Sequence, residues 1–240
     1  MNPIRFFSAL LLLALALTAG CEEETFKPIP PRERTFLHFL NVYSGIPAVD
    51  IRLISFEEKR TVADAVTFKN AWPSTGYASM LTTPDPDSID GKGGITIDFL
   101  DSNTKKPIVP ARTLKLAADV NSTICLVDSF GKPLIVKTVD NMPDYVPGKA
   151  FVRFMNLNYT VLSVSLVSED DSVSITKLNF LNYSSFSETS PGTKKFFFKN
   201  DFSGNTIGTI SNVDIQAGKV YSFFLTNQSG LPSVGYEVLR

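Results

Sequence analysis

The stretch FLHFLNVYSGIPAVDIRLIS (residues 36–55) has a counterpart in FVRFMNLNYTVLSVSLVS (residues 151–168). Phe36 aligns with Phe151, an offset of 115 residues, and the asparagine five positions later in each stretch coincides as well. After a two-residue contraction, the apolar positions that follow coincide at an offset of 113. A match of this length indicates that one structural unit is present twice.

A second match supports the repeat from the other end of the unit. LKLAADVNSTICLVDSFGKP (residues 114–133) aligns without a gap on VDIQAGKVYSFFLTNQSGLP (residues 213–232), at an offset of 99. Because the beginning and the end repeat in the same order, the sequence predicts two copies of one domain. The expected segments are a signal peptide (1–20), a tether (21–33), domain one (34–143), a linker (144–147) and domain two (148–240).

Each copy consists of short runs in which apolar and polar residues alternate. VDIRLIS (residues 49–55), ITIDFLD (95–101) and VSITKLNF (173–180) follow this period of two, which is typical of half-buried strands. No segment keeps a 3.6-residue apolar period over a helix length. About seven short strands per copy predict an all-β chain of two tandem, antiparallel, immunoglobulin-like β-sandwich domains.

The composition is that of a folded protein, with 43% hydrophobic and 20% charged residues among 240. Phenylalanine is frequent, at 19 residues, which suits pleated surfaces that are partly buried. The formal net charge is −1 and no basic stripe is present, so nucleic acid is not an expected partner.

The N-terminus has the pattern of a secretory signal. Arg5 is followed by the apolar run of residues 9–17 and by the small residues of TAG, directly before Cys21. This order resembles a bacterial lipoprotein signal, although Thr18 stands where that pattern most often has leucine. The resemblance implies acyl chains on Cys21, which would hold the protein at a membrane.

An acidic and proline-rich stretch follows the cysteine. Glu22, Glu23 and Glu24 resemble the export signal that directs lipoproteins of one group of Gram-negative bacteria to the outer face of the outer membrane. The prolines after them favour an extended tether that spans up to about 37 Å by residue 33. We therefore expect an outer-membrane lipoprotein that faces the cell exterior.

The second copy carries motifs that resemble a known family. It reads GKAFVRFMNLN (residues 148–158), SSFSETSPGTKKFFFKN (184–200) and IQAGKVYSFFLTN (215–227). These motifs resemble the bacterial domain-of-unknown-function family 4397, and the first copy departs from them where Ala118-Asp119 replaces the glycine of AGK. The resemblance implies secreted or surface β-sandwich modules, often in tandem and often lipidated. It implies no catalytic residues.

The chain offers little for catalysis. His38 is the only histidine, and the strand pattern predicts that it points away from the core, at the surface. Cys125 lies in an apolar strand-like run, which predicts a buried and inert thiol. Because no second histidine or matched carboxylate is evident, we expect neither an enzyme nor a cofactor.

An acidic loop and two short motifs are weaker candidates. Asp85, Asp87 and Asp90 precede a glycine in PDPDSIDG, which resembles a calcium loop, but the spacing differs by one and no glutamate closes it. An acidic surface loop is therefore the favoured interpretation. Ser88 and Ser172 stand in DSI and DSV, which resemble a bacterial O-glycosylation pattern.

Trp72 and Tyr77 are the candidate ligand contacts, because exposed aromatic rings near a loop can stack on sugars; a place in the core is the alternative. The predicted function is a non-catalytic, lipid-anchored cell-envelope protein. It would present a binding or spacer platform to an unidentified glycan or protein partner. The alternatives are a structural subunit of a surface polymer and a carboxylate-dependent glycoside hydrolase.

Overall fold

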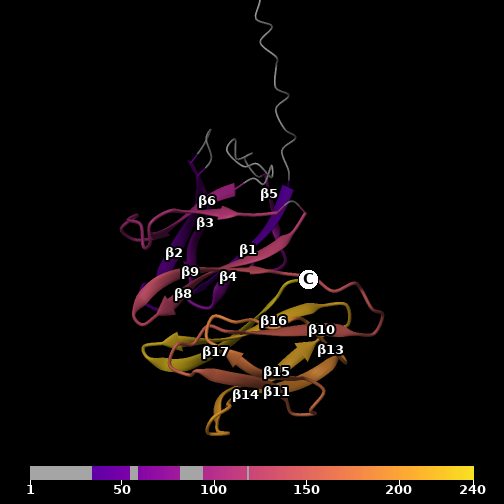
Figure 1. Ribbon diagram of the computed structural model, residues 1–240. Coiled ribbons are helices and arrows are strands. Elements are labelled where there is room, and N and C mark those ends of the chain that lie inside the picture. Colours follow the sequence, from indigo (N-terminus) through magenta and orange to yellow (C-terminus); the bar gives the residue numbers. More distant parts are fainter. Residues whose placement is uncertain (1–33, 55–58, 82–93, 118) are drawn as a thin grey trace, which may run out of the picture. The chain divides into compact units, whose positions relative to one another are not determined.

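The computed structural model describes residues 34–54, 59–81, 94–117 and 119–240 (Figure 1). These residues form strands, turns and irregular segments, and none of them forms an α-helix. No helix long and apolar enough to cross a membrane is therefore found in this part of the chain. By their contacts, the described residues all belong to one compact unit, Arg32–Arg240. The predicted all-β class is confirmed.

The described residues up to 139 form two sheets that we name A and B. Sheet A has the strand order β4-β1-β8-β9, with β5 also paired to β1, and sheet B has the order β3-β2-β6-β7. The strands of sheet A are β1 (Arg34–Val42), β4 (Asn70–Trp72), β5 (Ala78–Leu81), β8 (Asn121–Ser129) and β9 (Lys132–Val139). Those of sheet B are β2 (Ala48–Ile54), β3 (Lys59–Thr67), β6 (Gly94–Asp101) and β7 (Arg112–Lys115). We call sheets A and B together the first sandwich.

The residues from 150 onward form sheets C and D, which we call the second sandwich. Sheet C has the order β13-β10-β16-β17, and sheet D the order β12-β11-β14-β15. The strands of sheet C are β10 (Ala150–Asn156), β13 (Ser187–Thr189), β16 (Val220–Gln228) and β17 (Leu231–Val238). Those of sheet D are β11 (Ser163–Ser168), β12 (Ser174–Asn179), β14 (Gly192–Asn200) and β15 (Thr206–Ile215).

One pairing in each sandwich departs from the expected antiparallel arrangement. β1 pairs with β8 in parallel, and β10 pairs with β16 in parallel (Figure 1). A parallel pair needs a long connection, and in both sandwiches the intervening strands supply it. The expected antiparallel pairing therefore holds throughout sheets B and D, whereas sheets A and C each contain one parallel pair.

The register of these parallel pairs reproduces both offsets of the sequence repeat. Phe36 lies opposite Asn121, and Phe151 lies opposite Val220. From the first pair to the second, the phenylalanine moves by 115 residues and its partner by 99 residues. The repeated asparagine also has one role in both sandwiches. The side-chain amide of Asn156 donates to the Leu178 carbonyl at 2.9 Å, as that of Asn41 does to the Val66 carbonyl.

Each sandwich has a core of alternate side chains from its two facing sheets. Leu37 and Phe39 of β1 pack with residues of sheet B, and Val152 and Phe154 of β10 pack with residues of sheet D. The alternate residues of β1 and β10 point to the opposite faces of their sheets. These opposite faces are apolar too, and they form one further buried cluster of Leu40, Val42, Cys125, Val127, Met155, Leu157 and Phe224. The cluster joins sheet A to sheet C, and we call this contact the junction.

Candidate binding site at the junction

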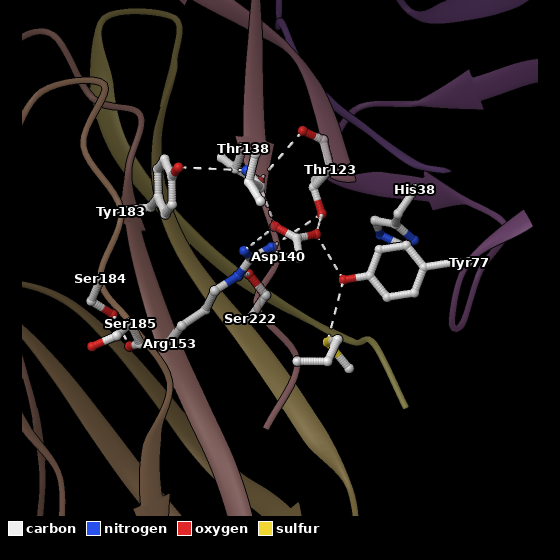
Figure 2. Close-up of polar contacts among 12 residues, drawn as sticks. His38, Tyr77, Thr123, Thr138, Asp140, Arg153, Tyr183, Ser184, Ser185 and Ser222 are labelled. Atoms are coloured by element: carbon white, nitrogen blue, oxygen red, sulfur yellow. Dashed lines mark hydrogen bonds and ion pairs between the residues drawn. The ribbon is translucent and has the colours of Figure 1, made fainter. Parts of the chain in front are cut away.

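A buried ion pair crosses the junction. Arg153 of β10 is 1% exposed, and its guanidinium bonds to the carboxylate of Asp140, which follows β9 (Figure 2). The Nε of Arg153 donates to Ser222 Oγ at 2.9 Å, and another nitrogen donates to Thr123 Oγ1 at 3.1 Å. Burial alone would lower the pKa of this guanidinium, but Asp140 outweighs burial and raises it.

The carboxylate of Asp140 is saturated with donors. Besides the guanidinium, it accepts hydrogen bonds from the hydroxyls of Thr123 at 2.5 Å, Thr138 at 2.7 Å and Tyr77 at 2.7 Å (Figure 2). Burial and the neighbouring negative charge raise the pKa of Tyr77, so its hydroxyl stays protonated and donates. A buried charge of this kind is tolerated because every partner is present.

A second charged pair crosses the junction, with its cation in the first sandwich and its carboxylate in the second. His38 of β1 is fully buried, and its Nε2 lies 2.7 Å from a carboxylate oxygen of Glu237 on β17. Its Nδ1 lies 2.8 Å from the carbonyl oxygen of Gly76. A carbonyl and a carboxylate both accept, so an imidazolium, with a proton on each ring nitrogen, satisfies both contacts of His38. Burial lowers the pKa of His38, but Glu237 and the Gly76 carbonyl outweigh it and raise the value above 6.5.

The prediction that His38 lies at the surface is wrong. Its strand position does point it away from the core of the first sandwich, but the second sandwich covers that face. A signal for this was present in the sequence, because FLHFLNV and FVRFMNL are apolar in both phases of the strand alternation. Strands that are apolar on both faces are typical of sheets buried on both sides.

An open groove of about 660 Å³ lies beside the junction. The first sandwich contributes the end of β3, the turn after it and β4, and the second sandwich contributes β17. Sequence reasoning named only one of its residues, Trp72. The lining residues are Asp64, Ala65, Val66, Thr67, Lys69, Asn70, Ala71, Trp72, Ser74, Tyr236, Glu237 and Val238.

Two contacts fix the walls of the groove relative to each other. The ammonium group of Lys69 donates to Ser233 Oγ and to the Val234 carbonyl, both at 3.2 Å. The backbone N–H of Gly76 donates to the Val238 carbonyl at 3.2 Å. Because these bonds and the buried ion pairs join the same two sandwiches, the groove is held open as one preformed site.

The two aromatic candidates, Trp72 and Tyr77, differ in their position relative to the groove. Trp72 is half-buried on β4 and packs against the core of the first sandwich, where its ring tilts against Phe39 at a centroid distance of 6.0 Å. It is also one of the residues that line the groove. Tyr77 is half-buried as well, but its hydroxyl is bonded to Asp140 inside the junction, and it is not among the residues that line the groove. Of the two, only Trp72 therefore lines the groove, and it also has the place against the core that was the alternative.

Cys125 has the expected environment. The thiol is free and fully buried in the cluster that joins sheets A and C. Burial raises its pKa well above the ordinary value, so the reactive thiolate is suppressed.

The other candidates from the sequence are not brought into this site. Cys21, the glutamates Glu22, Glu23 and Glu24, the aspartates Asp85, Asp87 and Asp90, and Ser88 all lie outside the described residues. Ser172 is exposed in the turn between β11 and β12, where its hydroxyl donates to Asp170 at 2.7 Å and accepts from Lys194 at 3.0 Å. Within the part of the chain that the structure describes, no group of three or more His, Cys, Asp or Glu residues is arranged to hold a metal ion.

Comparisons with known proteins give a similarity of fold only. No family model matches the chain, and no curated protein matches it significantly. Among solved structures, the C-terminal domain of AlgF from P. aeruginosa shares 17% identity at a TM-score of 0.31, covering 38% of this chain and 98% of that one.

Two longer matches cover most of both chains. A family 26 carbohydrate-binding module of Eubacterium rectale Amy13K, solved with maltoheptaose, shares 11% identity at a TM-score of 0.27 and covers 84% of this chain and 96% of its own. A protein of Bacteroides uniformis with a proposed role in cell adhesion shares 10% identity at a TM-score of 0.25, covering 88% and 98%. At these identities and TM-scores the similarities carry no conclusion about function.

Proposed function

We propose that this chain is a non-catalytic, lipid-anchored protein of the cell envelope, whose two sandwiches together present a small-ligand site. The observation that carries the proposal is the groove, because its two walls come from different sandwiches. A groove of about 660 Å³ lies within the range of about 300–1,000 Å³ that is typical of small-molecule sites. The junction fixes its shape before any ligand arrives, which lowers the entropic cost of binding.

The charged groups of the groove support binding rather than hydrolysis. A carboxylate-dependent glycosidase needs two convergent acids about 5–9.5 Å apart. The groove contains Asp64 and Glu237, but one oxygen of Glu237 is bonded to His38 and the other is buried without a partner. Only Asp64 of the groove is left with an exposed carboxylate. The groove therefore lacks the second of the two carboxyl groups that the hydrolysis requires.

The outer edge of β17 is an unfavourable place for the strand exchange that the polymer-subunit alternative requires. Strand exchange needs an open row of backbone donors and acceptors at a sheet edge. On β17, two of the outward carbonyls are already engaged by Lys69 and Gly76 of the first sandwich. This edge is therefore closed to the addition of a long strand.

The anchor and its direction rest on the sequence. Cys21 would carry the acyl chains, and the residues that follow would give reach, so that the groove stands clear of the bilayer. The triplet Glu22, Glu23 and Glu24 favours display on the cell exterior.

Protease shaving of intact cells, with mass analysis of the N-terminal peptide, tests location and anchor together. We expect an acylated Cys21 and release of residues from the tether onward, whereas Cys21→Ser should leave the protein without lipid. Replacing the three glutamates by alanine should keep the lipid but protect the protein from the protease. An unmodified cysteine would overturn the anchor, and protection of the wild type would overturn the outward direction.

A further inference from the structure

The edge of β17 presents a backbone donor and acceptor to the groove. The carbonyls of Val234 and Val238 accept from the first sandwich, whereas the N–H of Leu239 donates to Val220 at the start of the neighbouring strand β16. Backbone groups alternate between the two sides of an antiparallel strand, so Tyr236 faces the same side as Val234 and Val238. Its N–H and C=O therefore lie on the groove side, between the two bridging contacts. A hydroxyl group can pair with both, because it donates and accepts.

Trp72 contributes an aromatic residue to the lining of the same groove. Its ring is half-buried and held by Phe39, so it loses little freedom when a ligand packs on it. The C–H face of a sugar ring matches an aromatic ring, because it is apolar while the hydroxyls around it remain free for hydrogen bonds. Asn70 and Ser74 add further polar groups to the lining, and the amide nitrogen of Asn70 is bonded to Thr67, which leaves its carbonyl oxygen as an acceptor.

The charges of the lining balance one another. Lys69 offsets Asp64, and the His38 imidazolium offsets Glu237. The ammonium of Lys69 is also already bonded to Ser233 and to the Val234 carbonyl. A phosphate or carboxylate ligand would need an uncompensated cation, whereas a neutral polyhydroxylated ligand does not.

From these features we infer that the groove binds a short segment of a neutral saccharide. The sugar ring would pack on Trp72, and its hydroxyls would bond to the backbone of Tyr236 and to the side chains of Asn70 and Ser74. The inference rests on the proposed function, because it names the ligand class of the groove that the proposal treats as a binding site.

Trp72 is the only tryptophan of the chain and lines the groove, so intrinsic tryptophan fluorescence reports on a single position, and the variants below test whether a response comes from the groove. The purified full-length protein in detergent micelles is titrated with maltotriose, cellotriose, chitotriose and mannotriose, each to about 10 mM, ten times a Kd of about 1 mM. Sialyllactose and the peptide trialanine serve as the anionic and peptide comparators. We expect a saturable change with at least one of the neutral trisaccharides.

Variants locate the response. Asn70→Ala and Ser74→Ala should each weaken the binding about tenfold, the typical effect of losing one hydrogen bond. Ser203→Ala, an exposed position in the turn between β14 and β15, should leave it unchanged. A response that survives both groove variants would overturn the inference, because the sugar would then be bound elsewhere.

The failures of the two proposals can be told apart. No saturable response to any neutral trisaccharide overturns the saccharide inference, and so does a response to sialyllactose or trialanine alone. If only sialyllactose or trialanine gives a response, the groove still binds a ligand, and the proposed function stands. Shaving of intact cells tests the location and does not depend on the sugar.

Discussion

Removing the carboxylate of Asp140 should destabilise the protein more than removing one partner of an exposed ion pair does. Asp140→Ala leaves the guanidinium of Arg153, which is 1% exposed, without its counter-charge, and it also takes an acceptor from the hydroxyls of Thr123, Thr138 and Tyr77. Breaking a buried ion pair on one side costs about 3–5 kcal/mol. We expect a loss of this size in the free energy of unfolding.

A double substitution separates the lost pair from general damage. Replacing both partners of a buried ion pair by apolar groups is often close to neutral. Asp140→Ala combined with Arg153→Met should therefore be more stable than the sum of the single losses predicts, by at least about 2 kcal/mol. The matched control is Glu188→Ala, because Glu188 pairs with Lys149 at the surface and exposed pairs contribute about 0–1 kcal/mol.

Urea unfolding gives the free energies, and the junction has its own reporter. Cys125 is buried where sheets A and C meet, so a thiol reagent reaches it only when the junction opens. With Cys21 replaced by serine, the rate of labelling measures that opening, and it should rise in Asp140→Ala but not in Glu188→Ala. A loss below about 1 kcal/mol, or a double variant whose loss equals the sum of the singles, would refute the argument.

Three further predictions follow from the described contacts. The raised pKa of His38 means that its pairing with Glu237 stabilises the fold fully below about pH 6.5, and that this contribution is lost as the pH rises through the folded-state value. Wild-type stability should therefore fall as the pH rises above about 6.5, and His38→Gln should remove that dependence. Phe130 stands at φ 55° in the turn between β8 and β9, so Phe130→Gly should be about 1 kcal/mol more stable than Phe130→Ala in urea unfolding. Asn156→Ala leaves the Leu178 carbonyl unbonded, and calorimetry should show a loss of about 1–3 kcal/mol.

Each of these predictions has a result that contradicts it. His38 is the only histidine, so a pH dependence that persists in His38→Gln would assign the titration to another group. Equal stability of the two Phe130 variants would mean that the left-handed turn imposes no strain. Asn41→Ala is the matched partner of Asn156→Ala, because the two asparagines hold corresponding contacts, and clearly unequal losses would contradict that correspondence.

The sequence alone determined the strands, their faces and the repeat. Alternation in residues 49–55 and 95–101 placed Ile51 and Phe99 on the core side, because a period of two depends only on neighbouring residues. The offsets of 115 and 99 reappear in the register of the two parallel pairs, since repeated sequence folds into repeated structure.

Only the tertiary structure decided what covers the second face of sheets A and C. His38 and Glu237 are 199 positions apart, and Asp140 reaches Arg153 across the junction, so neither pairing follows from local pattern. The groove has the same origin, because Asn70 and Trp72 belong to one sandwich and Tyr236 to the other. Alternation assigns each side chain to a face of its sheet, but which faces meet depends on how the two sandwiches pack, and that packing places the charged pairs and the candidate site.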